Sequence, residues 1–365
     1  MKVLALASYP TEAAATRYRL EQFVAPLAER GITLNVHPFI DSKLFEQLYR
    51  RKSWPRTAIG LAKSALLRPA ELVGAYQADV VLIQREAMIF GPPLIEWLTT
   101  QVLKRPMVLD LDDATYVSYT SPTYGGIGRA LKWFSKTDNL IRWATIVTCG
   151  NRSIAEYVAS NGAQARIIPT VVDTDVFRPA RDRSEVGQVV LGWIGTHSTF
   201  PYLESIFPAL RELARNHAFR LRIVGAGKDE INIPGVDVES LPWRLEREVP
   251  DFQSIDIGLY PIDASLYSGK WAAGKSGFKA IQYMAVGVPY VATPVGASAE
   301  LGEVGVTHFL ASNQQEWRDA LAELIVNADK RWQMGVAGRS HVTEQFALPV
   351  HADKLAAVLR EAATK

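Results

Sequence analysis

The sequence predicts an α/β protein with two doubly wound domains, each a parallel sheet covered by helices on both faces. The chain has 365 residues, about twice the size of a common domain. Short apolar runs typical of buried strands alternate with helical patterns from the first residue onward. This alternation stops in the polar, proline-containing segment 177–187 and then starts again. We therefore expect two Rossmann-like domains, at 1–178 and 179–344, with a cleft between them.

The first half contains apolar runs that we expect to form strands at 3–9, 31–39, 78–86, 105–113, 144–150 and 164–173. A helical pattern at 16–31 follows the first run and ends at Gly31, a common helix stop. The second half contains similar runs at 188–195, 219–227, 236–243, 254–261 and 288–296. Ligands of open parallel sheets bind at the carboxyl ends of the strands, so the loops after these runs are the candidate sites.

The end of the chain has apolar residues at helical spacing in 349–365. We expect a C-terminal helix over about 345–365 that packs on the first domain.

Composition excludes several classes of protein. The formal net charge of +2 is too small to indicate a nucleic-acid partner. Cys149 is the single cysteine, so no internal disulfide forms, and a reducing, cytoplasmic compartment is expected. The opening MKVLALASYP is too short to span a membrane and is better read as a buried strand than as a signal peptide. The histidines show no metal-ligand spacing, and we expect no metal.

The segment 41–69 is basic and aromatic, with Arg50, Arg51, Lys52, Arg56, Lys63 and Arg68 among Phe45, Tyr49 and Trp54. Two readings are equally supported. The segment can lie on an anionic membrane surface, which would place the protein on the inner face of the cytoplasmic membrane. Alternatively, it is a solvated helix packed on its own domain.

A phosphate-loop pattern occurs late in the chain, where Gly269, Gly274, Lys275 and Ser276 fit G-x-x-x-x-G-K-[ST]. A true phosphate loop directly follows a strand, but here DASLYS separates the expected strand from Gly269. The pattern therefore does not indicate a nucleotide hydrolase. A helix beginning near Phe278 would still favour an anion at its N-terminus. Lys275 and Lys279, one turn apart, suit a diphosphate.

Three segments resemble one family of enzymes. FKAIQYMAVGVPYVATPVG (278–296), IIPTVVDTDVFRP (167–179) and the tail 317–349 are similar to motifs of the retaining, nucleotide-sugar-dependent glycosyltransferases of family 4. The likeness extends over nearly the whole chain. It implies the GT-B fold, no cofactor, and a UDP- or GDP-linked sugar as donor substrate.

The chain departs from the family pattern at its signature, which places two glutamates eight positions apart. Gly274 and Gln282 occupy those positions. Gln282 can still bond a ribose hydroxyl, but more weakly than a carboxylate would. The loop after the first strand of the second domain lacks the usual Arg and Lys. It offers amides and hydroxyls instead, from Gly195, Thr196, His197 and Ser198.

The resemblance also suggests roles for other residues. Lys275 and Lys279 would replace the missing cations and stabilise the leaving diphosphate, with Lys279 counted as catalytic. The nucleotide base would lie near Val224, Gly225 and Trp243, although Trp243 fits core packing better than stacking. Gly274 and Ser276 would contact phosphate.

We place the acceptor side in the first domain. Asp110 is expected to be structural, whereas Asp112 or Asp113, at the same strand end, would position the acceptor hydroxyl. Arg85 would meet an anionic acceptor group or form a salt bridge with Glu86 or Asp113. Arg17 and Arg19, after the first strand, would serve likewise.

The sequence thus predicts a metal-independent, retaining hexosyltransferase that acts on a glycan or lipid-linked acceptor in bacterial surface polysaccharide or glycolipid synthesis. Two alternatives remain. A non-catalytic nucleotide-sugar-binding or scaffold protein fits the missing carboxylates. A sugar-nucleotide epimerase would share the fold, but it needs acid and base groups around the donor.

Overall fold

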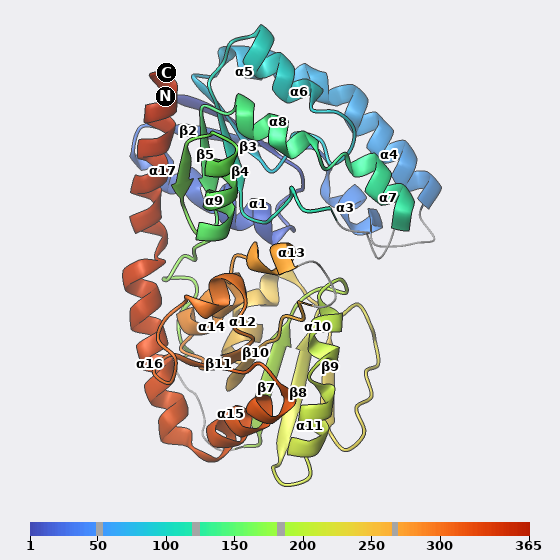
Figure 1. The fold of residues 1–365 in the computed structure, drawn as a ribbon, viewed down its shortest axis with the longest axis vertical. Coiled ribbons are helices and arrows are strands. Elements are labelled where there is room, and N and C mark those ends of the chain that lie inside the picture. Colours follow the sequence, from blue (N-terminus) through green and yellow to red (C-terminus); the bar gives the residue numbers. More distant parts are fainter. Residues whose placement is uncertain (49–53, 119–124, 181–186, 265–268) are drawn as a thin grey trace. The chain divides into compact units, whose positions relative to one another are not determined.

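The computed structural model describes residues 1–48, 54–118, 125–180, 187–264 and 269–365. The chain divides into two compact units (Figure 1). Unit 1 comprises Met1–Val171 and Leu348–Lys365, and unit 2 comprises Val172–Ala347. Arg50, Arg51 and Lys52 of the expected basic segment lie outside the described residues.

Unit 1 contains a six-stranded, fully parallel sheet in the order β2-β1-β3-β4-β5-β6. The strands are β1 (Lys2–Ala7), β2 (Thr33–Pro38), β3 (Val80–Gln84), β4 (Met107–Leu111), β5 (Ile146–Cys149) and β6 (Ala165–Ile167). The direction of strand addition reverses between β1 and β3. This switch point is where open α/β sheets bind ligands, so it is the first place to look for a site.

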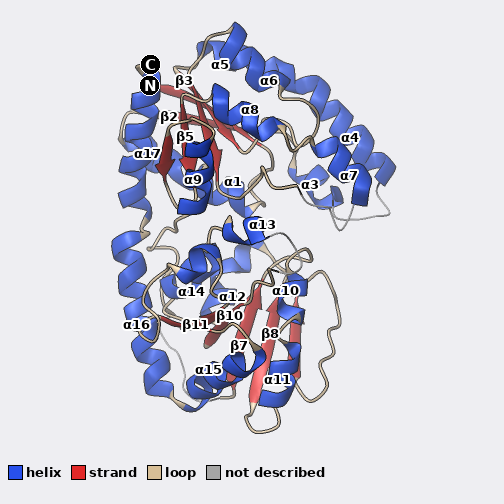
Figure 2. Cartoon of the chain, in the orientation of Figure 1, coloured by secondary structure: helices blue, strands red, loops and turns tan. Residues whose placement is uncertain are grey.

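Helices surround this sheet (Figure 2). They are α1 (Ala14–Arg19), α2 (Val24–Glu29), α3 (Ser42–Leu48), α4 (Trp54–Leu67), α5 (Glu71–Gln77), α6 (Leu94–Trp97), α7 (Gly125–Lys132), α8 (Lys136–Trp143), α9 (Arg152–Ser160) and α17 (Leu348–Ala363). The single helix predicted at 16–31 is wrong in one respect, because it is interrupted at Leu20 and by a 3-10 turn over Glu21–Phe23. Pro26 explains the restart, since proline fits only the first turn of a helix.

The C-terminal helix α17 is part of unit 1. It contacts α2, β3 and β4, and it buries Leu355 and Leu359. Arg30, which follows α2, donates from Nε to Oδ1 of Asp353 on α17 at 2.7 Å.

Unit 2 repeats the architecture with the parallel order β12-β11-β10-β7-β8-β9. Its strands are β7 (Val189–Ile194), β8 (Phe219–Val224), β9 (Asp237–Leu241), β10 (Ile257–Tyr260), β11 (Tyr290–Ala292) and β12 (His308–Leu310). Its helices are α10 (Phe200–Glu204), α11 (Phe207–Leu213), α12 (Glu248–Gln253), α13 (Gly269–Ala273), α14 (Phe278–Ala285), α15 (Gln314–Val326) and α16 (Ala328–Gln345). The switch point lies between β7 and β10.

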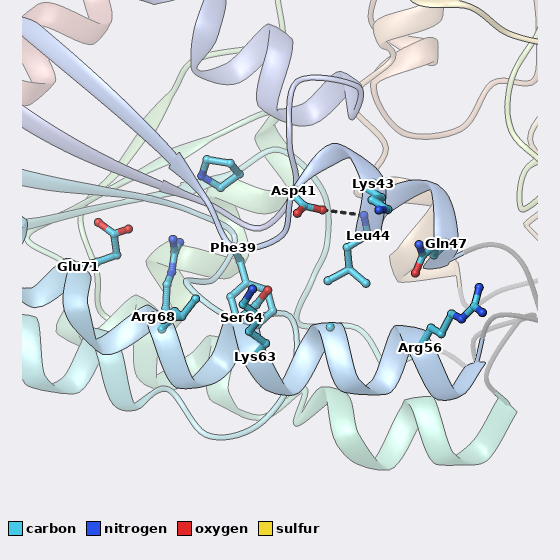
Figure 3. Close-up of a pocket in the computed structure, with 13 residues that line it drawn as sticks. Phe39, Asp41, Lys43, Leu44, Gln47, Arg56, Lys63, Ser64, Arg68 and Glu71 are labelled. Atoms are coloured by element: carbon cyan, nitrogen blue, oxygen red, sulfur yellow. Dashed lines mark hydrogen bonds between the residues drawn. The ribbon is translucent and has the colours of Figure 1, made fainter.

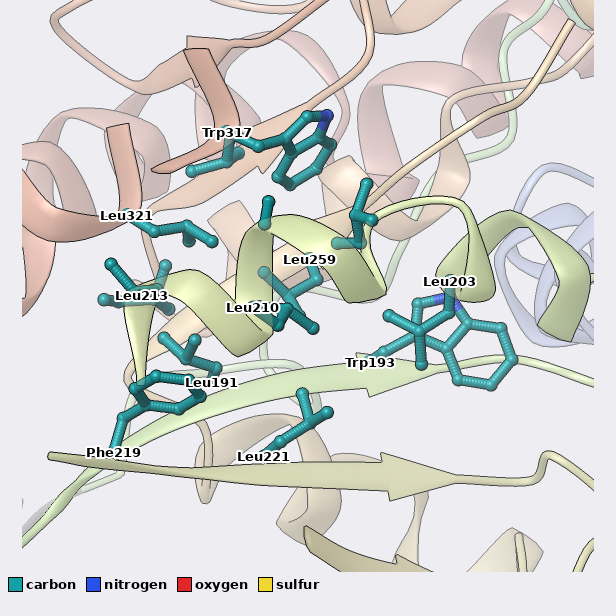
Figure 4. Packing of buried hydrophobic residues seen from close by; sticks show 14 of the residues in the cluster. Leu191, Trp193, Leu203, Leu210, Leu213, Phe219, Leu221, Leu259, Trp317 and Leu321 are labelled. Atoms are coloured by element: carbon teal, nitrogen blue, oxygen red, sulfur yellow. The ribbon is translucent and has the colours of Figure 1, made fainter. Parts of the chain in front are cut away.

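One face of the unit 2 sheet forms a dense apolar core with α10, α11 and α15 (Figure 4). Trp193 of β7 packs edge-on against Phe200, with ring centroids 6.0 Å apart. Trp317 and Leu321 of α15 close the same cluster. This packing fixes the position at which β7 ends and its following loop begins.

In the part of the chain that the structure describes, no helix is both long and apolar enough to cross a bilayer.

Candidate functional site

The loop after β7 is a tight turn lined with hydroxyl groups. Gly195 leaves no room for a side chain, because a Cβ there would lie 2.1 Å from Trp193 and 2.9 Å from the Thr199 hydroxyl. Thr199 Oγ1 accepts a hydrogen bond from the Thr196 amide at 3.1 Å. The Thr196 and Ser198 hydroxyls lie 2.8 Å apart. The loop therefore presents several neutral donors at the sheet edge.

The loop after β8 comes directly against this turn. Gly225 has φ +82°, and a Cβ on it would lie 2.3 Å from the carbonyl oxygen of Gly195 and 3.1 Å from Cβ of Trp243. A Cβ on Gly227 (φ +71°) would similarly lie 3.1 Å from Cβ of His197. Burial lowers the pKa of His197 below its ordinary value. The predicted residues Gly195, His197, Gly225 and Trp243 thus gather at the carboxyl edge beside the switch point.

Two residues predicted near a nucleotide base differ in what they offer. The side chain of Val224 is fully buried and packs in the core. We therefore assign Val224 a structural role instead of the predicted contact with the base. Trp243 is half-buried at the end of β9, next to Gly225. Its role in base contact stays a prediction.

The segment 269–277 does not form a phosphate loop. Gly269–Ala273 is the helix α13, and the amides of Gly274 and Lys275 donate to the carbonyls of Trp271 and Ala272. Because the amide of Gly274 already donates to Trp271, it does not face a phosphate, and the prediction of Gly274 as a phosphate contact is wrong. Gly277 is the residue that needs to be glycine here: it has φ +67° at the start of α14, and a Cβ would meet Leu301 at 2.5 Å.

Two lysines lie at the N-terminal end of α14, as predicted. Lys275 stacks on Trp271, with Nζ 4.5 Å from the ring centroid. Lys279 is half-buried, and its pKa is lowered to about 8. Burial is the main cause; Glu248 opposes this lowering and Lys275 adds to it. Ser276, between the lysines, is half-buried. A bound anion would offset the free-energy cost of burying the charged amine of Lys279. This end of α14 therefore favours a phosphate ligand.

Glu248 is a candidate residue that sequence reasoning missed. It opens α12 and is 8% exposed, and its Oε1 accepts a hydrogen bond of 3.5 Å from Nε2 of Gln282. Gln282 itself is 3% exposed. A carboxylate therefore lies beside the position where the family signature has glutamate, but it comes from another helix. No local motif marks Glu248; pairing it with Gln282 requires the fold.

In β4 of unit 1, Asp110 is structural, as predicted. Arg19 donates from Nε to its Oδ2 at 3.0 Å, and the Thr148 hydroxyl donates to Oδ1 at 2.6 Å. Arg19 also donates to the carbonyl of Ile168 and is 4% exposed. The prediction of Arg19 as an acceptor contact is therefore wrong, because its guanidinium is committed to a buried ion pair. Arg17 is half-buried and donates to the carbonyls of Thr11 and Glu12.

Arg85, at the end of β3, pairs with the two aspartates that follow β4. Arg85 bonds both carboxylate oxygens of Asp112. Its Nη2 atom also lies 3.8 Å from a carboxylate oxygen of Asp113, one of the two predicted partners. The other predicted partner, Glu86, pairs instead with Lys132 and Lys136. Burial disfavours the charge on Asp112, but Arg85 outweighs it and holds the pKa of Asp112 below its ordinary value. Asp112 is thus committed to Arg85, which leaves Asp113 as the more accessible carboxylate.

Arg85 also has an uncommon backbone, with φ +61°. Such a conformation is uncommon in a residue other than glycine, carries strain, and occurs in clusters at functional sites.

Among the described residues, no cluster of His, Cys, Asp and Glu could hold a metal ion.

Comparisons with known proteins agree with this architecture. Residues 188–327 match the family described as Glycosyl transferases group 1. The alpha-1,3/1,6-mannosyltransferase ALG2 of Rhizomucor pusillus is 32% identical over 91 residues, which are 24% of this chain and 20% of that protein. The match thus spans about a fifth of the curated relative's length.

Solved structures resemble the whole chain. HepE of Anabaena in complex with UDP-glucose superposes with a TM-score of 0.70 at 16% identity, covering 99% of this chain and 100% of that one. Sucrose-phosphate synthase of Thermosynechococcus elongatus gives 0.68 at 14% identity, covering 99% and 98%. At such identities the likeness shows the fold alone, and the predicted GT-B fold is confirmed.

Proposed function

Because residues 188–327 carry a domain of the Glycosyl transferases group 1 family, we propose that this protein is a glycosyltransferase using a nucleotide diphosphate sugar as donor. The observation that carries the proposal is that the hydroxyl-lined loop after β7 and the glycine turn after β8 meet at the carboxyl edge of the unit 2 sheet. The strand order places the N-terminal end of α14, with its lysine pair, at the same edge, because α14 follows β10, the neighbour of β7. UDP-glucose in the related HepE structure supports a UDP-linked donor, with a GDP-linked donor as the alternative.

The chemistry follows from where charge develops. When the bond between the sugar and the diphosphate breaks, negative charge grows on the leaving diphosphate, and preorganised cations and donors stabilise it. Lys279 and Lys275 supply the positive charge, and the Thr196 and Ser198 hydroxyls supply neutral donors. We further propose transfer of a hexose with retention of configuration and without a metal.

The acceptor is proposed to bind at the carboxyl edge of the unit 1 sheet. Asp113 would accept a hydrogen bond from the acceptor hydroxyl, and Arg85, with Asp112 fixing its orientation, would face an anionic group. An acceptor in bacterial surface polysaccharide or glycolipid synthesis fits these residues. Peripheral contact with the inner face of the cytoplasmic membrane is proposed through α4, which exposes Ile59 (71%) and Leu66 (82%).

Titration of UDP, GDP and their glucose and mannose derivatives tests the donor site. One nucleotide class should bind, and Lys275→Ala and Lys279→Ala should each weaken it by about tenfold or more, because each removes a charge-assisted contact. Arg215→Ala removes an exposed cation of unit 2 and serves as the matched control. If none of the nucleotides binds, the proposal fails.

A non-catalytic nucleotide-sugar-binding protein is the second candidate, because Gln282 replaces a signature carboxylate. Slow hydrolysis of the bound donor separates the two. A transferase releases free sugar from its donor at a rate that falls in Lys279→Ala, whereas a binding protein releases none above background.

A further inference from the structure

A pocket lies in unit 1, and its lining residue Arg68 bonds the carbonyls of Ala7 and Ala87, beside the ends of β1 and β3. It has a volume of about 470 Å³ and opens between α3 and α4 (Figure 3). That volume is within the usual range for small-ligand sites. The buried Phe39 and Leu44 give it an apolar floor, and the exposed Leu67 also lines it.

Positive charge dominates the pocket lining. Lys43, Arg56, Lys63 and Arg68 line it together with only two carboxylates, Asp41 and Glu71. Asp41 caps α3 by accepting from the Leu44 amide at 2.7 Å, and Glu71 bonds Nδ1 of His37 at 2.7 Å. Both carboxylates are thus committed, and within the described chain Lys43, Arg56 and Lys63 form no ion pair with them.

Arg68 is the buried member of this set. It is 3% exposed, and its guanidinium donates only to main-chain carbonyls, those of Ala87 (2.9 Å), His37 (3.0 Å) and Ala7 (3.3 Å). Burial lowers its pKa to about 10, so it remains charged at neutral pH. A buried guanidinium held by carbonyls, with no carboxylate bonded to it among the described residues, leaves a net positive charge that attracts an anion.

The exposed apolar side chains of α4 indicate where that anion comes from. Trp54, Ile59 and Leu66 are exposed on the helix that also carries Arg56 and Lys63. Apolar side chains beside cations are typical of a helix lying at a lipid surface. We propose that the pocket between α3 and α4 binds the phosphate of an anionic lipid headgroup, with the apolar floor against the lipid's first carbons. This inference rests on the membrane contact proposed above and adds a specific site to it.

The test compares vesicles of equal charge but different chemistry. The full chain is titrated with phosphatidylcholine vesicles containing either phosphatidic acid or oleate, matched in zeta potential. We expect at least tenfold tighter binding to phosphatidic acid. Replacing Arg56 and Lys63 by alanine should weaken binding roughly fivefold for each charge removed. Lys354→Ala, which removes an exposed cation of α17, is the matched control and should change little.

Two further variants separate a pocket from diffuse attraction. Ser64→Leu fills the pocket without changing charge and should abolish the preference for phosphatidic acid while leaving the weaker binding seen with oleate. Gly60→Ala narrows the pocket, because a Cβ on residue 60 would lie 2.7 Å from Leu44. The melting temperature of this variant is measured as well, to detect any loss of stability. Equal binding to both vesicles, or a preference that survives Ser64→Leu, overturns the pocket but not the membrane contact. If the protein binds neither kind of vesicle, the proposals of the lipid pocket and of the membrane contact both fail. The proposed nucleotide site in unit 2 is tested independently by the nucleotide titrations.

Inorganic phosphate distinguishes a lipid from a soluble ligand. The lipid proposal expects it to compete only at millimolar concentrations. If phosphate instead saturates the protein at micromolar concentrations, and phosphatidic acid vesicles do not displace it, the ligand is a soluble anion and the proposal is overturned.

Discussion

Arg85 and Asp112 form a two-point ion pair, with Nε to Oδ1 at 2.6 Å and Nη2 to Oδ2 at 2.7 Å. The pair joins the ends of β3 and β4, and Arg85 has a left-handed backbone conformation. Its parallel geometry is the strongest form of carboxylate recognition by arginine. Asp112 therefore orients Arg85 and is not itself available to a substrate.

Asp112→Asn should destabilise unit 1 by about 2–4 kcal/mol, because the mostly buried Arg85 loses its paired charge. Asp113→Asn, at the more accessible carboxylate, should change stability by less than about 1 kcal/mol. Urea unfolding followed by circular dichroism measures both variants. Equal effects at the two positions would contradict the assignment of the structural role to Asp112.

The same pair predicts an acid dependence. The folded pKa of Asp112 lies below the unfolded value of about 3.9, so its contribution is complete above that value and lost as pH falls through the folded pKa. The difference in unfolding free energy between wild type and Asp112→Asn should thus be constant at pH 5–7 and shrink below about pH 4. A difference that stays constant down to pH 2.5 would argue against the ion pair.

Nucleotide binding should weaken above about pH 8, where Lys279 loses its proton. Above this pKa the dissociation constant should rise by up to tenfold for each pH unit, since only the charged amine attracts the diphosphate. Lys279→Arg keeps its charge and should remove the dependence. Calorimetric titration of UDP between pH 6.5 and 9.5 checks this, and a wild-type constant that stays flat would exclude Lys279 from the diphosphate contact.

Glu248→Gln should move that pH midpoint below about 8, because Glu248 raises the pKa of Lys279. The control is Gln282→Ala, which removes the amide contact with Glu248 but no charge and should leave the midpoint in place. If Glu248 serves only to pack α12, its substitution changes the melting temperature and not the midpoint.

Gly225→Ala should cost about 2 kcal/mol or more, combining an unfavourable backbone conformation with a collision against the Gly195 carbonyl. Gly162→Ala provides the comparison, since Gly162 also has positive φ (+77°) but nothing within 4 Å of its Cβ position. Gly225→Ala alone should also weaken nucleotide binding. Indistinguishable unfolding and binding curves for the two variants would show that the contact between the loops is unimportant.

The sequence predicted the architecture well because buried parallel strands are continuous apolar runs, and such runs stand out at 78–86 and 105–113. It also placed Gly195, Gly225 and Lys279 at strand ends and a helix start. It could not assign partners. That Arg19 pairs with Asp110, 91 positions away, or that Glu248 meets Gln282, depends on strand order and helix packing. The rejection of the phosphate-loop pattern from its distance to the preceding strand was correct, but the sequence did not show that Gly269–Ala273 forms a helix that engages the Gly274 amide.

Unit 1 is completed by α17, after the chain has passed through all of unit 2. A ribosome therefore finishes every strand of both sheets before it makes the helix that buries Leu355 and Leu359 against β3 and β4. The apolar surface of unit 1 that α17 covers stays exposed for the whole of that time. The order of synthesis thus gives unit 1 the longer interval in which chaperones and proteases can reach its core.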